Sequence, residues 1–102
     1  MKYSLAVSGF FIALMFTTKG FAAEAPIWPL DEVCAHESDR TACYEFESIA
    51  KRQVLGPWHT LPDSPRESCV AEVKSFGQPS YRLLELCLNR KLFEQWQSAR
   101  QK

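Results

Sequence analysis

Apolar residues recur at the three- and four-residue spacing of amphipathic helices in three stretches of the chain, which predicts an all-α fold. The first predicted helix runs from about Asp39 to Leu55, with Ser38 as its N-cap and Gly56-Pro57 as its end. Its predicted inner face carries Ala42, Cys43, Phe46, Ile49, Ala50 and Val54.

The second predicted helix follows a short turn at residues 58–61 and has the clearest start signal in the chain. Ser64 can act as N-cap, Pro65 suits the first helical position, and Glu67 completes a capping box. Gly77 can adopt the left-handed conformation that ends a helix. The predicted inner face carries Cys69, Val73 and Phe76.

The third predicted helix starts near Pro79 or Ser80 and extends to about Arg100. Its main apolar stripe is Tyr81, Leu84, Leu88, Leu92 and Trp96. Further apolar surface is offered by Leu83, Leu86, Cys87 and Phe93, so we expect this helix to pack on more than one side. With a short helical turn between Leu30 and His36, the pattern predicts a small three-helix bundle that runs up, down and up.

The N-terminus has the layout of a secretory signal peptide. Lys2 precedes an uncharged run from Tyr3 to Thr18, and small residues follow at Gly20, Ala22 and Ala23. The run is shorter than the roughly 20 apolar residues of a spanning helix, so we expect no stable membrane span after cleavage. We predict a signal peptide at residues 1–22, cut after Ala22 or Ala23, and one disulfide-stabilised helical domain at 23–102. An uncleaved membrane tether is the alternative.

The mature chain is close to 80 residues long, enough for one domain with a thin core. The whole chain has 12 basic and 12 acidic residues, and two of the lysines, Lys2 and Lys19, precede the predicted cleavage site. The mature net charge is therefore near −2. Such a chain has no electrostatic attraction to nucleic acid or anionic lipid, so neither is expected as a partner.

Four cysteines in a small exported chain predict two disulfides. Cys69 and Cys87 lie about eight residues before and after the turn at 77–79, which places them at one level on antiparallel helices. A Cys43–Cys69 bond would span an axial mismatch above roughly 10 Å, whereas a disulfide needs Cα atoms within about 7 Å. We predict Cys34–Cys43 with Cys69–Cys87. The nested set, Cys34–Cys87 with Cys43–Cys69, stays open as the alternative.

Residues that could carry catalysis or hold a metal do not form a recognisable motif. The two histidines, His36 and His59, lie near predicted helix ends and beside no nucleophile. Cys34-Ala-His36 lacks the C-x-x-C spacing of zinc sites, and Glu45 and Glu47 are two apart on a helix, so they point in different directions. We therefore predict no catalytic residue, no cofactor, no metal ligand and no enzymatic activity.

Aromatic residues near both ends of the mature chain form the most functional-looking surface. The N-terminal segment offers Trp28, and the end of the third helix offers Leu92, Phe93 and Trp96 among basic residues. A basic and aromatic amphipathic end can dock a partner helix or a membrane surface. The alternative is that these aromatics close the ends of the small core.

Three motifs are shared with a group of known sequences: Trp58-x-x-Leu61, Arg66-x-x-Cys69 and Pro79-Ser80-Tyr81-x-x-Leu84-x-x-Cys87-Leu88. With them the chain, from about residue 34 to 88, resembles small four-cysteine exported proteins of Gram-negative bacteria, of alphaproteobacterial type. Gly77-Gln78-Pro79 has one glycine fewer than the Gly-Gly-x-Pro of that group, and the helix after Leu88 diverges. The resemblance implies a periplasmic location and a cysteine framework, and it brings no functional residue with it.

These observations favour a non-catalytic interaction or accessory protein of the bacterial cell envelope, located in the periplasm and acting on a protein partner. A secreted effector, or a small protein directed at competitors, is the second hypothesis. A small metal carrier or hydrolase is the third.

Overall fold

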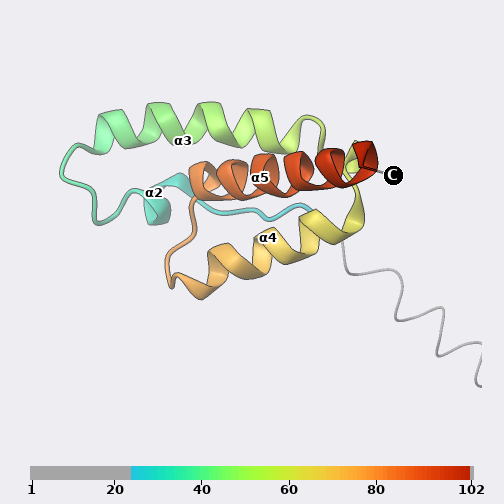
Figure 1. Ribbon diagram of the computed structural model, residues 1–102. Coiled ribbons are helices and arrows are strands. Elements are labelled where there is room, and N and C mark those ends of the chain that lie inside the picture. The colour runs from blue at the N-terminus through green and yellow to red at the C-terminus, as the bar shows by residue number, and fades with distance from the viewer. Residues whose placement is uncertain (1–23, 102) are drawn as a thin grey trace, which may run out of the picture.

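The computed structural model describes residues 24–101, and within this range it contains helices and no strand. The predicted signal peptide and both predicted cleavage positions lie outside the described residues, which begin at Glu24. Three long helices run up, down and up, which confirms the all-α prediction (Figure 1). The elements are α2 (Leu30–Val33), α3 (Arg40–Leu55), a 3₁₀ turn η1 (Trp58–Thr60), α4 (Asp63–Ser75) and α5 (Tyr81–Arg100).

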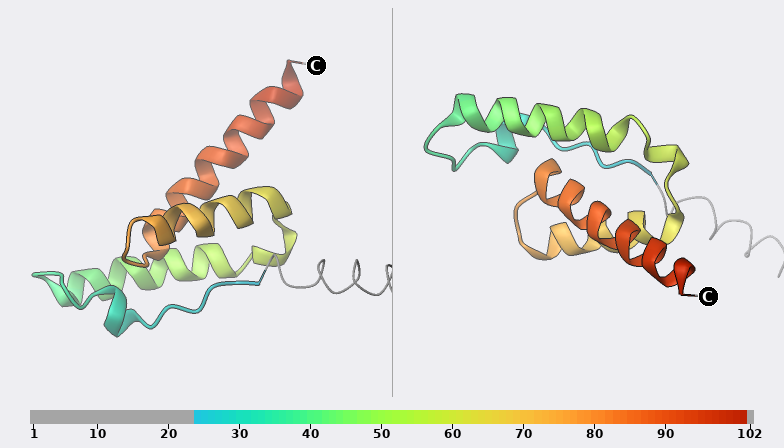
Figure 2. Two further views of the ribbon diagram at one scale, coloured as in Figure 1. Left: turned by 90° about the horizontal axis from the view of Figure 1, so that it is seen from below. Right: turned by 45° about the horizontal axis from the view of Figure 1, so that its top comes forward.

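Helix α5 holds the fold together, because it packs against both α3 and α4. Figure 2 shows that its last turns leave the other helices and project away from them. The core therefore surrounds only the first half of α5. Its buried residues are Ala50, Val54, Trp58, Cys69, Val73, Tyr81, Leu84, Cys87 and Leu88.

Both predicted disulfides are confirmed. Cys34 is bonded to Cys43 with their Cα atoms 5.8 Å apart, and Cys69 is bonded to Cys87 with a Cα separation of 5.6 Å. The first bond ties α2 to the start of α3, and the second joins α4 to α5 inside the core. The equal level of Cys69 and Cys87 along antiparallel helices therefore predicted the correct pairing, and the nested alternative is wrong.

The N-terminal arm, residues 24–29, runs back along the bundle in an extended conformation (Figure 2). The Trp28 N–H donates to the Tyr81 hydroxyl at 2.8 Å, and that hydroxyl donates to the Pro26 carbonyl at 3.2 Å. The Trp28 and Tyr81 rings lie 5.1 Å apart. The arm thus packs against the start of α5 at Tyr81 and forms part of the folded domain.

Two of the three predicted helix starts need correction. Asp39, one residue after the predicted Ser38, is the N-cap of α3, since its carboxylate accepts from the Ala42 N–H at 3.0 Å. The carboxylate of Asp39 is a stronger acceptor for a helix N-terminus than the Ser38 hydroxyl. The start of α5 is as predicted: the Ser80 hydroxyl accepts from the Leu83 N–H at 3.2 Å.

The capping box predicted for α4 is wrong. The helix begins at Asp63 after Pro62, so Ser64 and Pro65 lie within its first turn and no side chain caps it. Asp63 pairs with Arg66 instead, and Arg66 also donates to the Trp58 carbonyl at 3.1 Å. The first contact lies within the first turn of α4, and the second ties that turn to η1. At the other end Gly77 has φ of +83°, which confirms its predicted left-handed conformation.

The predicted inner faces are only partly correct. On α3, Ala50 and Val54 are buried as expected, but Phe46 and Ile49 are exposed and Glu47 is buried in their place. On α4, Phe76 is exposed because the helix has ended and the chain turns there. On α5, Trp96 is exposed because the helix has passed the edge of the core. These apolar side chains are therefore available at the surface.

Candidate functional site

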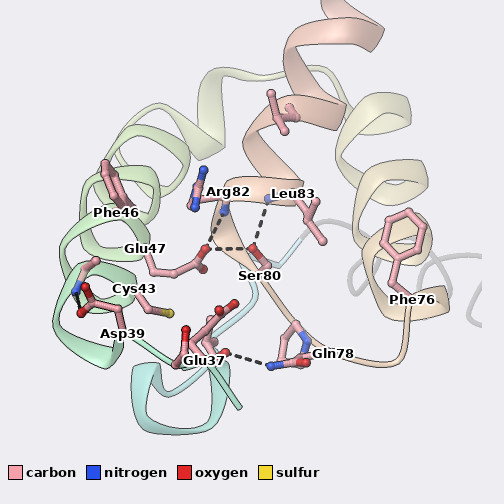
Figure 3. Close-up of a pocket in the computed structure, with 15 residues that line it drawn as sticks. Glu37, Asp39, Cys43, Phe46, Glu47, Phe76, Gln78, Ser80, Arg82 and Leu83 are labelled. Atoms are coloured by element: carbon pink, nitrogen blue, oxygen red, sulfur yellow. Dashed lines mark hydrogen bonds between the residues drawn. The ribbon is translucent and has the colours of Figure 1, made fainter. Parts of the chain in front are cut away.

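A groove opens beside the α4–α5 turn, between the start of α3 and the first turns of α5 (Figure 3). Its volume is about 650 Å³. We call it the α3–α5 groove. Its rim consists of four large apolar side chains that are exposed to solvent: Phe46 (53%), Phe76 (60%), Leu83 (39%) and Leu86 (64%).

The base of the groove is a buried carboxylate, Glu47, which is only 3% exposed. Its Oε1 accepts from the Tyr81 N–H at 2.7 Å. Its Oε2 accepts from the Ser80 hydroxyl at 2.8 Å and from the Arg82 N–H at 3.4 Å. Backbone N–H groups at a helix start lack intrahelical partners and carry partial positive charge, so an anion there is favourable. Glu47 thus fixes the start of α5 against α3.

Sequence reasoning missed this role, because it considered Glu47 only as one half of a weak pair with Glu45. A detectable signal does exist. Glu47 lies four residues after Cys43 and three before Ala50, so it interrupts the stripe that continues to Val54. A charged residue inside an apolar helix face needs a buried partner, and the N-terminus of a neighbouring helix is one of the few available.

The two ends of the groove are also anchored. The Gln78 side-chain amide donates to the Val33 carbonyl at 3.0 Å, which ties the α4–α5 turn to α2. The Cys34–Cys43 bond holds the loop that lies on the opposite side. The apolar rim is therefore mounted on elements that are fixed by hydrogen bonds and a disulfide.

Charge is unevenly distributed around the groove. Glu37 and Asp39, both exposed, line the end that faces the α2–α3 loop. Arg82 lies over the Phe46 ring with its guanidinium 5.1 Å from the ring centre. One end of the groove is thus acidic, while the α5 side carries a cation held against an aromatic ring.

The aromatic residues predicted as a partner surface divide into two places. Trp28 is half-buried against Tyr81, near the start of α5. Phe93 and Trp96 lie on the projecting end of α5 with their rings stacked 5.8 Å apart, and Leu92 is half-buried beside them. Fifteen residues of helix separate Tyr81 from Trp96, which corresponds to roughly 22 Å. The structure therefore keeps Leu92, Phe93 and Trp96 together and leaves Trp28 apart.

The projecting end of α5 is exposed, basic and aromatic. Phe93 and Trp96 are both more than half exposed. The Arg100 guanidinium lies 4.8 Å from the centre of the Trp96 ring. Arg90, one turn before Phe93, is paired with Glu72 of α4 at 2.8 Å. The hydrogen bond that Arg90 donates to Glu72, together with the charge of that carboxylate, raises the pKa of Arg90.

Other candidate chemistry is dispersed. His36 and His59 are exposed on separate turns. Within residues 24–101, no three histidine, cysteine or acidic side chains are placed to hold a metal ion together. None of the helices in the described part of the chain is long and apolar enough to cross a membrane. The groove and the end of α5 are thus the surfaces with the clearest capacity to bind.

Comparison with protein-family models, with curated proteins and with solved structures finds no match to this chain.

Proposed function

We propose that this protein is a non-catalytic interaction protein of the bacterial cell envelope, which acts in the periplasm and binds a protein partner through the α3–α5 groove. The observation that carries the proposal is the exposed apolar rim of Phe46, Phe76, Leu83 and Leu86. Monomeric soluble proteins rarely leave several large apolar side chains together in water unless the patch binds something.

The state of the polar groups in the groove favours binding over catalysis. Both oxygens of the Glu47 carboxylate already accept hydrogen bonds from the start of α5. A general base must reach its substrate, whereas Glu47 is only 3% exposed and already accepts three hydrogen bonds. The side chains of Ser80 and Gln78 are likewise engaged in structural hydrogen bonds. What the groove presents outward is mainly apolar surface with an acidic end.

Two disulfides in a domain of this size fit an oxidising compartment. Together with the predicted signal peptide and the resemblance to exported Gram-negative proteins, they support the periplasmic part of the proposal. Cell fractionation tests it. Recovery of the processed chain only from the culture medium would contradict a periplasmic role and would favour a secreted effector.

Site-specific photo-cross-linking in living cells tests the groove. A photoreactive amino acid at Leu86 should yield a discrete adduct that mass spectrometry identifies, because Leu86 lies on the rim. The matched control is the same amino acid at Glu67, which is exposed on α4 about nine residues before Phe76 and outside the groove. Equal labelling at both positions, or no adduct at Leu86, would refute the groove as the binding surface.

A further inference from the structure

The outward face of α5 carries a continuous stripe that begins inside the groove and ends on the projecting turns. Its members are spaced alternately three and four residues apart: Leu83, Leu86, Arg90, Phe93 and Gln97. This is the spacing of a seam along which two helices pack. All five are exposed, so the stripe is open to a partner helix, with only Arg90 reaching sideways to Glu72 of α4 among these side chains.

The two halves of the stripe are chemically complementary. The first half lies in the groove, where Leu83 and Leu86 are bordered by the acidic residues Glu37 and Asp39. The second half carries the stacked Phe93–Trp96 pair with Arg100 over it. An apolar groove with an acidic end therefore occurs in the same chain as an apolar helix end with a basic tip.

We propose that the protein forms a two-fold symmetric dimer in which the α5 helices of two copies pack antiparallel along this stripe. The inference rests on the proposed function and names the occupant of the groove as the end of α5 from a second copy. In this register Leu86 of one copy faces Phe93 of the other, and Leu83 lies opposite the turn that carries Gln97 of the stripe. The two-fold axis makes each contact occur twice, so the assembly closes at two copies.

The charges agree with the same register. Arg100 of the second copy comes opposite Pro79, which lines the groove next to Glu37 and Asp39. Opposite charges at the edge of an interface fix its register and orientation. Arg90 lies close to the two-fold axis, where it approaches its counterpart, but each Arg90 is already paired with Glu72 of its own chain at 2.8 Å. That pairing reduces the repulsion between the two guanidinium groups.

A membrane surface is a poorer occupant. The acidic residues at the groove and the mature net charge near −2 oppose approach to anionic lipid. A second copy covers the apolar surface of both the α3–α5 groove and the projecting end of α5, whereas a lipid surface could cover only the helix end.

Sedimentation equilibrium of the processed chain, with both disulfides intact, tests the proposal across micromolar concentrations. We expect a reversible monomer–dimer equilibrium. L86E and F93E should each weaken the dimer at least about tenfold, because each buries a carboxylate in the apolar seam twice per dimer. The matched control A71E, on the exposed face of α4, changes the charge equally and should leave the dimer intact. Far-UV circular dichroism verifies that each variant is folded.

A charge-pair rescue tests the register. L86E and F93K alone should each favour the monomer, while the double variant L86E/F93K should recover dimer, since position 86 of one copy faces position 93 of the other. A wild-type chain that is monomeric at all concentrations tested, a dimer unaffected by L86E and F93E, or a double variant without recovery would overturn the proposal. A monomer whose Leu86 still cross-links to a different protein would refute the dimer and leave the proposed function standing.

Discussion

A buried carboxylate at the base of the groove determines how α3 and α5 meet. Glu47 receives hydrogen bonds from Ser80, Tyr81 and Arg82, so its charge is matched by three donors at a helix start. A buried charge is tolerated only when it is satisfied in this way. Glu47 therefore helps to position the groove rim although it is almost completely buried.

Replacing Glu47 by Gln should lower the free energy of unfolding by about 2 kcal/mol, since hydrogen bonds to charged groups contribute roughly 1.5–3 kcal/mol. The amide can accept at one oxygen only, and its N–H₂ group then faces the donors of α5. Urea denaturation of the oxidised protein measures the change. Glu45→Gln, at an exposed site on the same helix, is the control and should shift stability by less than about 0.5 kcal/mol. Equal effects of the two substitutions would contradict the capping role.

Tyr81 joins the N-terminal arm to the core through its hydroxyl. Tyr81→Phe keeps the buried ring and removes the hydrogen bonds with the Trp28 N–H and the Pro26 carbonyl. We expect the free energy of unfolding to fall by about 1 kcal/mol and hydrogen exchange at the Trp28 amide to become faster. Tyr44→Phe on α3 is the control. Unchanged exchange at Trp28 would show that the hydroxyl does not hold the arm.

At the scale of the elements, helix position was more predictable than helix orientation. Gly77 and Ser80 marked their boundaries correctly because their roles depend on local backbone geometry and local hydrogen bonds. The exposure of Phe46 was not predictable from periodicity, because it depends on which helix lies above α3. The predicted α4 start was too late: Asp63 already belongs to the first turn, where it pairs with Arg66, and Arg66 also contacts Trp58 before the helix.

The groove itself could not be predicted from the sequence. It exists because Phe76 lies just past the end of α4 while Leu83 and Leu86 lie on the side of α5 that faces away from the core. The apolar excess of α5 was visible in the sequence, but it was assigned to internal packing. Only the positions of α3 and α4 relative to α5 show that this surface faces solvent.

The projecting end of α5 should be dispensable for folding. Deleting residues 93–102 should change the free energy of unfolding by less than about 1 kcal/mol, because residues 93–101 are exposed. Deleting 88–102 also removes the buried Leu88 and should cost about 2–5 kcal/mol. Thermal and urea unfolding at low micromolar concentration, where association adds little stability, measures both. Equal losses from the two deletions would mean that the end of α5 belongs to the core.

On the scale of the whole molecule, covalent bonds compensate for a thin core. A single core formed within residues 24–101 supplies only a few kcal/mol of net stability. The Cys69–Cys87 bond lies within the buried cluster, whereas Cys34–Cys43 joins the end of α2 to the start of α3 and leaves Cys43 half-buried. The two bonds should therefore differ in their contribution to stability.

Removing the bond between Cys69 and Cys87 by a double alanine replacement should cost about 3 kcal/mol, and removing Cys34–Cys43 about 2.5 kcal/mol, from loops of 18 and 9 residues. The lost core packing adds to the first value. Reducing both disulfides should lower the free energy of unfolding by an amount comparable to the whole stability of a small domain. Most of the helical circular dichroism signal should therefore disappear at 37 °C. Retention of full helicity after complete reduction would contradict this estimate.

Each disulfide joins two cysteines that follow one another along the chain with no other cysteine between them, Cys34 with Cys43 and Cys69 with Cys87. A chain that emerges from a ribosome or a translocon with its N-terminus first presents these thiols in that order. An oxidant that links cysteines as they appear thus makes the native set directly, with no later thiol exchange. Noncovalent contacts must wait longer, because Trp28 bonds to a tyrosine 53 residues further along and Glu47 bonds to the start of the same helix. Maturation accordingly finishes with noncovalent steps, in which the N-terminal arm and α3 dock onto the last helix.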